Sequence, residues 1–109
     1  MSVAEWIAAD LRADLTLCTE LFILIERENQ LLLLPQDFSR FEFYRQRKEF
    51  LPALDESLDK LKQHRVAWHR LSASERQHSP EIFALIHSLQ DLIMRIVMLD
   101  RENEQLLLR

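Results

Sequence analysis

The chain has 109 residues and contains no glycine, although average usage of roughly 7% would give about eight. Walker-type loops and dinucleotide fingerprints need glycine where backbone amides approach a phosphate, so neither site can form here in its usual way. Type I′ and II′ hairpin turns also depend on glycine for positive φ. With three prolines and no Asn-Gly or Asp-Gly step, the sequence predicts an all-α protein.

Cysteine is almost absent as well, since Cys18 is the single one. One thiol can form neither an internal disulfide nor a multi-thiolate metal site, which is typical of a reducing compartment. The first residues lack the basic and then apolar pattern of a signal peptide, and no uninterrupted apolar run approaches the length of a membrane span. We therefore expect a cytoplasmic protein without stable membrane insertion.

Neither sign of charge dominates the composition. Fourteen lysines and arginines against 18 acids give a net charge of −4, so no global field attracts nucleic acid or an anionic membrane. Nucleic acid is therefore not an expected partner. The 48% of apolar residues are enough to bury a core, and the length predicts a single domain over residues 1–109.

Apolar residues with helical periodicity predict three long helices, at about residues 3–34, 38–71 and 80–107. Ser2 and Glu5 have the spacing of a capping box at the start of the first helix. Pro35 should end this helix, and Asp37 can cap the second. Short connections favour antiparallel neighbours, so we expect an elongated antiparallel three-helix bundle with coiled-coil-like packing.

Proline and serine mark the later boundaries. Pro52 falls inside the second helix, where it removes one hydrogen bond, and we expect a kink near Lys48. The polar residues 72–79 break the apolar pattern, which indicates the second connection. Ser79 followed by Pro80 is then typical of a new helix start.

An Arg-Glu-Asn sequence occurs near the end of both the first and the third helix. These two helices should be parallel, and counting from their starts brings Asn29 and Asn103 to a similar level. We expect the two amides to bond and to fix the register, as a single polar residue does in coiled coils. The alternative is a pair of solvated asparagines.

Catalytic and metal-binding chemistry has little support. His64 and His69 are five residues apart and diverge by about 140° on a helix, so they are poor joint ligands. We expect them, His78 and His87 to be surface histidines. Cys18 falls in the apolar stripe and is predicted to be a small buried hydrophobe rather than a nucleophile. The sequence therefore predicts no catalytic residue, no metal site and no cofactor.

The charged clusters are interpreted as solvated helix faces. The acidic ones are Asp55, Glu56, Asp59, Glu26 and Glu28, and the basic one is Arg45, Arg47 and Lys48. General acid-base catalysis would also need a cleft, and three helices with short loops offer little concavity. We expect neither enzyme activity nor a small-molecule substrate.

The third helix carries more apolar surface than a core stripe needs. Met94, Val97 and Met98 are spaced three and four residues apart, so they form one ridge. Methionine is pliable and is common on surfaces that bind amphipathic partner helices. A fourth element or a second copy of the chain could cover the same ridge.

Several segments resemble the FlgN-type flagellar export chaperones. They are residues 20–32, then Asp37 and Phe41, Arg47-Lys48 with Leu51, the Leu54-Leu58-Leu61 run to Arg65, and residues 99–107 with an asparagine before paired leucines. The resemblance covers about residues 20–107. The FliT-type chaperones are a close rival, because Ile96-Val97-Met98-Leu99-Asp100 is similar to their later helices.

The resemblance implies a small cytoplasmic chaperone that binds the C-terminal helical segment of a hook-associated protein, prevents its premature assembly and delivers it to the flagellar type III export apparatus. FlgN-type proteins commonly continue into a tail that contacts the export gate, and such a tail is not found here before Arg109. The late part of these chaperones holds the substrate site. The expected contact residues are Met94, Val97, Met98, Asp100, Asn103 and Leu107.

Two functions thus follow from the sequence. The first is the chaperone, as a monomer or a homodimer. The second is a structural coiled-coil protein that self-associates through the third helix.

Overall fold

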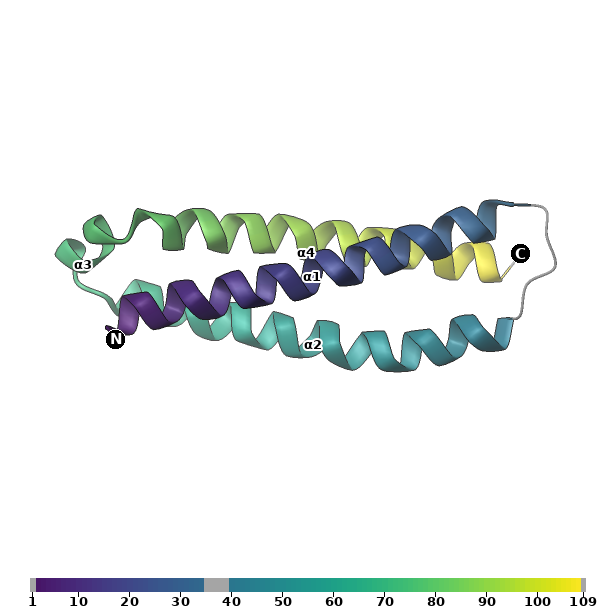
Figure 1. The fold of residues 1–109 in the computed structure, drawn as a ribbon, viewed down its shortest axis with the longest axis horizontal. Helices are drawn as coiled ribbons and strands as arrows, with labels where there is room; N and C mark the ends of the chain where they lie inside the picture. The colour runs from purple at the N-terminus through teal and green to yellow at the C-terminus, as the bar shows by residue number, and fades with distance from the viewer. Residues whose placement is uncertain (1, 35–39, 109) are drawn as a thin grey trace.

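The computed structural model describes residues 2–34 and 40–108. This part of the chain contains helices and no strand, with α1 at Val3–Leu33, α2 at Arg40–Arg70, α3 at Ala73–His78 and α4 at Pro80–Leu107. The long helices lie along one axis and give an extended molecule with extents of 57 × 18 × 17 Å (Figure 1). The predictions of an all-α fold and an elongated shape are confirmed for these residues.

The first and last helix boundaries agree with the sequence signals. Ser2 caps α1, and its hydroxyl accepts a hydrogen bond from the Glu5 amide at 3.1 Å. Leu34 is the C-cap of α1. Helix α4 spans Pro80–Leu107, as predicted, with proline in its first turn. The expected roles of Pro35 and Asp37, and the predicted start of the second helix at Phe38, lie outside the described residues.

The polar segment 72–79 is more than the connection that we expected, because it contains the short helix α3. Ser72 Oγ accepts from the Glu75 amide, and Glu75 Oε1 accepts from the Ser72 amide, each at 3.1 Å. This reciprocal capping box satisfies two amides that a helix start leaves free. The hydrogen bond from the Ser72 backbone lowers the pKa of Glu75. A local motif thus forms a helix that buries none of its own residues.

Helix α2 continues through Pro52 and does not restart there. Pro52 is exposed, whereas Phe50 and Leu54 on either side of it are buried. The face of α2 that meets the other helices therefore lacks the proline ring. The expected kink near Lys48 stays a prediction.

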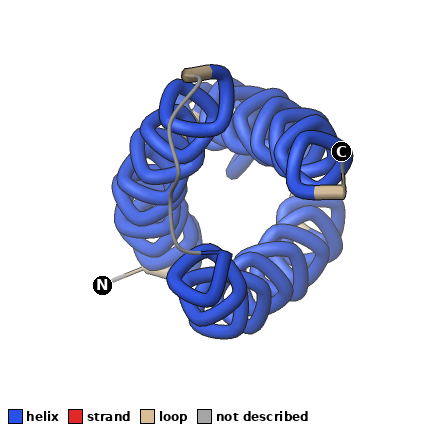
Figure 2. Tube along the Cα trace, turned by 90° about the vertical axis from the view of Figure 1, so that its right-hand side faces the viewer, coloured by secondary structure: helices blue, strands red, loops and turns tan. Residues whose placement is uncertain are grey.

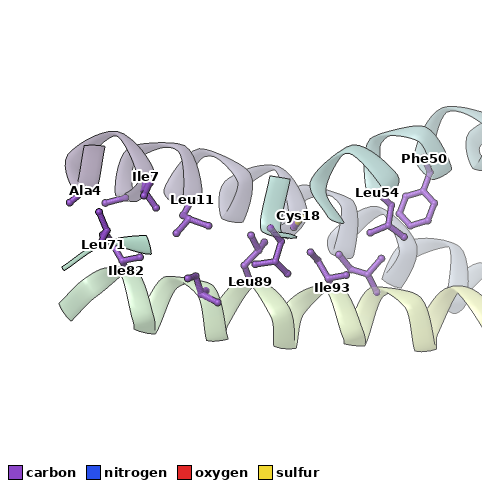
Figure 3. Packing of buried hydrophobic residues seen from close by; sticks show 14 of the residues in the cluster. Ala4, Ile7, Leu11, Cys18, Phe50, Leu54, Leu71, Ile82, Leu89 and Ile93 are labelled. Atoms are coloured by element: carbon purple, nitrogen blue, oxygen red, sulfur yellow. The ribbon is translucent and has the colours of Figure 1, made fainter. Parts of the chain in front are cut away.

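Helices α1 and α4 run in the same direction, and α2 runs in the opposite one (Figure 1). Each of the three contacts the other two, most extensively α1 with α4. Seen along the molecule, they surround a common axis (Figure 2). Ile7 and Leu11 of α1 face Ile82 and Leu89 of α4 in the core (Figure 3). Cys18 is fully buried among these side chains, which confirms the prediction of a small buried hydrophobe.

Helix α4 is long and apolar enough to cross a membrane by length and composition, with a mean hydropathy of 1.7 over 18 residues. This finding qualifies the expectation from the sequence, which considered uninterrupted apolar runs. The core helix of a soluble protein has the same composition. Here α4 contributes Ile82, Ile86, Leu89, Ile93 and Ile96 to the core.

Candidate protein-binding surface

Helix α4 exposes apolar side chains along one face. Met94 is 58% exposed and Met98 is 66% exposed. Phe83, also exposed, lies eleven residues before Met94, about three helical turns, and therefore on the same face. Val97 is partly buried and packs against the core beside them. We call Phe83, Met94, Val97 and Met98 the α4 stripe.

The other three expected contact residues are not on this surface. Asp100, Asn103 and Leu107 are buried at 7%, 1% and 4% exposure. Their placement on a partner-binding surface is therefore corrected, because other parts of the chain already cover them. The buried positions of α4 follow a spacing of four and three residues that runs through all three: Ile82, Ile86, Leu89, Ile93, Ile96, Asp100, Asn103 and Leu107.

The structure brings the two expected asparagines together. Asn29 Nδ2 on α1 donates to Asn103 Oδ1 on α4 at 2.9 Å. Asn103 Nδ2 in turn donates to the backbone carbonyl of Ile25 at 3.1 Å. Asn103 therefore links α4 to both a side chain and the backbone of α1. Neither residue is exposed, so the alternative of two solvated asparagines does not describe this contact.

An ion pair next to this contact connects α2 with α4. Arg47 Nη2 lies 3.1 Å from Asp100 Oδ2 and 3.6 Å from Glu104 Oε2. Burial raises the pKa of Asp100, and the charge and hydrogen bond of Arg47 oppose that effect. Arg47 was expected on a solvated face together with Arg45 and Lys48. That expectation is wrong for Arg47, whose side chain is 17% exposed.

Glu28 also departs from the expectation of a solvated face, because it is 4% exposed. Burial raises its pKa to about 7, the charge of Asp100 adds to this effect, and the charge of Arg47 opposes it. Two carboxyl groups thus share the field of one guanidinium in the interior. This cluster of Glu28, Asp100, Arg47 and the two asparagines is called the polar layer below.

Two further polar contacts join α1 to α2. Asp10 is hydrogen-bonded to His64, which is 2% exposed, so the expectation of a surface position is wrong for this histidine. Ser57 Oγ donates to Asp14 Oδ1 at 2.8 Å. Burial raises the pKa of Asp14 and also that of the Cys18 thiol. His69, His78 and His87 are exposed, as predicted.

These interior groups are placed as contacts between helices. Ser57, His64 and Cys18 are nearly inaccessible to solvent, and a nucleophile or general base has to reach its substrate. Within residues 2–34 and 40–108, no cluster of three or more histidine, cysteine, aspartate or glutamate side chains could hold a metal ion.

A pocket of about 160 Å³ lies between α2 and α4. Its lining residues are Arg65, Trp68, His69, Phe83, Ile86, His87 and Gln90. Phe83 belongs to both this pocket and the α4 stripe. The sequence analysis missed the pocket, because the aromatic residues that form it come from two helices.

A comparison of the chain with protein-family models, with curated proteins and with solved structures finds no match.

Proposed function

We propose that the protein is a binding protein that holds an amphipathic helical segment of a partner along the α4 stripe. The observation that carries this proposal is the exposure of Met94 and Met98 on one face of a helix whose opposite side forms the core. Contiguous exposed apolar area marks interaction surfaces. Methionine adapts its shape to an apolar partner, and partner helices present anchors at the same spacing.

We propose that α1, α2 and α4 form an antiparallel three-helix bundle with coiled-coil-like packing. Support comes from the buried positions of α1, which follow the spacing of three and four residues that α4 also has: Ala4, Ile7, Leu11, Asp14, Cys18, Ile25, Glu28 and Leu32. Such a scaffold holds α4 straight against two neighbours. Its outer face then presents the stripe as a rigid surface.

The partner that we propose is the C-terminal helical segment of a hook-associated protein. The resemblance to FlgN-type chaperones supports this assignment, as does the position of the stripe on the last helix, where these chaperones bind their substrates. Binding would keep the segment from assembling prematurely in the cytoplasm and present it to the flagellar export apparatus. The contact residues are then Met94, Val97 and Met98 with Phe83, and the mechanism needs no catalytic residue or cofactor.

A binding experiment tests this proposal. The probe is a synthetic peptide of the C-terminal helical segment of a hook-associated protein from the organism that encodes the chain. Titration calorimetry should give saturable binding, and Met98→Asp should weaken it at least tenfold, because a carboxylate buried against an apolar partner loses its hydration. Val66→Asp is the matched control on the outer face of α2, where Val66 is 49% exposed, and should bind normally.

Circular dichroism checks that both variants remain helical. Absence of peptide binding to the unaltered chain would contradict the proposal, as would equal binding by the two variants.

Self-association through the same stripe is the second candidate, and the same exposed methionines favour it. Light scattering at several protein concentrations separates the two. A stable dimer that Met98→Asp converts to a monomer would support self-association. A monomer that binds the peptide would support the chaperone.

A further inference from the structure

The pocket between α2 and α4 has walls made of aromatic rings. The Trp68 ring centroid lies 5.7 Å from that of Phe83, and the Phe83 centroid lies 4.3 Å from that of His87. His69 packs edge-on against Trp68 at 5.1 Å. Rings from both helices therefore surround the space, and offset or edge-on aromatic contacts of this kind hold their geometry.

The charge around these rings has one sign. Arg65 lines the pocket with His69 and His87, and the lining residues include neither aspartate nor glutamate. Arg76 lies over the Trp68 ring, with its guanidinium carbon 5.5 Å from the ring centroid. An arginine and two imidazoles can all donate to a carboxylate, and an arginine can do so with two parallel hydrogen bonds.

The size of the pocket limits what it can hold. Sites that enclose a whole small-molecule ligand measure roughly 300–1,000 Å³, whereas this one measures about 160 Å³. A single side chain or a similar fragment is the matching occupant. Because Phe83 is also the first residue of the α4 stripe, a helix lying on that stripe reaches the pocket at its end.

We propose that this pocket anchors the partner helix by taking an apolar side chain whose neighbour carries a carboxylate. The aromatic walls contact the apolar group, and Arg65 at the rim binds the carboxylate. The inference rests on the proposed function, because it names the chemistry that one end of the partner must have. It predicts an acidic residue beside an aromatic or aliphatic anchor at that end.

The test uses a small probe that needs no knowledge of the partner. 3-Phenylpropionate has a phenyl ring next to a carboxylate, and 3-phenylpropylamine has the same ring with a positive charge. The carboxylate should shift the indole N–H signal of Trp68 in a nitrogen-15 NMR titration and should saturate. The amine should bind at least fivefold more weakly. Trp6 does not line the pocket, so its indole signal is an internal control.

Arg65→Gln should weaken 3-phenylpropionate binding at least threefold, because it removes the charge and keeps most of the side-chain length. Arg12→Gln is the matched control on α1, and Arg12 is exposed like Arg65. Equal affinity for the two probes, an equal shift of the Trp6 signal, or an unchanged affinity of Arg65→Gln would each overturn the inference.

Failure of this inference can be distinguished from failure of the proposed function. If the hook-associated peptide binds in a Met98-dependent manner while 3-phenylpropionate does not bind, the pocket proposal is wrong and the stripe remains the binding surface. If 3-phenylpropionate binds in an Arg65-dependent manner while the peptide does not bind, the pocket has the proposed ligand chemistry, but its role in anchoring the proposed partner is wrong.

Discussion

Six polar side chains are buried in the described part of the chain: Asp14, Glu28, Ser57, His64, Asp100 and Asn103. A buried polar group is costly unless it has a hydrogen-bond or charge partner. Ser57 meets Asp14, His64 meets Asp10, and Asn103 meets Asn29. Pairing between helices thus offsets part of the cost, and it also makes the interior polar contacts specific to one arrangement.

Glu28 leads to a prediction about pH. Its pKa is about 7 in the folded protein against an ordinary value of 4.5, so the folded state holds more protons than the unfolded state between these values. Stability therefore falls as the pH rises from about 4.5 through 7 and then levels off. Glu28→Gln should remove this loss and be more stable than the unaltered chain at pH 8, by about 1–3 kcal/mol, since one pKa unit corresponds to about 1.4 kcal/mol.

Urea denaturation at pH 5 and pH 8 measures this effect. Glu26→Gln is the control, because Glu26 is exposed on the same helix, and its stability should change by less than about 0.5 kcal/mol. A stability difference for Glu28→Gln that does not grow with pH would show that Glu28 is not a buried acid in solution.

At the scale of the element, proline and the capping motifs act differently. The Ser-x-x-Glu spacing places a helix start both at Ser2 and at Ser72, because the motif satisfies amides locally and needs no tertiary contact. Pro52 removes one hydrogen bond of α2, yet the helix continues. Burial of Phe50 and Leu54 beside it stabilises the helical form.

Pro52→Ala should therefore stabilise the protein. Alanine restores the missing amide donor and removes the clash with the preceding turn, and proline costs up to about 3 kcal/mol in a helix interior. Part of this gain is lost because the unfolded chain becomes more flexible, so we expect a net gain of about 1–2 kcal/mol. Thermal denaturation measures it, with exposed Gln63→Ala as a control that leaves the helix backbone unchanged.

A lower melting temperature for Pro52→Ala would contradict this expectation. It would mean that a bend at this position is needed to bring Phe50 and Leu54 into the core.

For the whole molecule, the polar layer lies at a level where α1, α2 and α4 all contribute a side chain. Asn29 and Glu28 come from α1, Arg47 comes from α2, and Asp100 and Asn103 come from α4. Sliding one helix by a turn would separate these partners, whereas apolar side chains could find new neighbours. The layer is therefore suited to fix the register of the three helices.

Asn103→Leu tests the role of the asparagine contact. It removes the bond to the Ile25 carbonyl and leaves Asn29 without its acceptor, which should cost about 1–3 kcal/mol in stability. Combining it with Asn29→Leu should cost less than the sum of the two single changes, because the double variant leaves neither amide unpaired. Urea denaturation of the four proteins gives this coupling, and strictly additive costs would contradict it.

Exposed Gln105→Leu is the matched control on α4. It adds the same side chain two residues away and should leave stability within about 0.5 kcal/mol.

The sequence by itself determined the helical class, the boundaries of α1 and α4, and the apolar ridge at Met94 and Met98. These follow from local rules, namely the absence of glycine, capping spacings and helical periodicity. It also indicated the pair of Asn29 and Asn103, because the Arg-Glu-Asn repeat places both at one level of parallel helices.

Only the tertiary structure decided which polar residues lie inside. Glu28, Arg47, His64 and Asp100 look like surface residues when polarity alone is considered, although three of them continue the buried spacing of their helices. Whether such a position is buried depends on a partner from another helix, such as Arg47 for Asp100 or Asp10 for His64. Two helices must meet before a buried charge is tolerated or a pocket such as that of Trp68 and Phe83 can form, and local periodicity contains no information about that meeting.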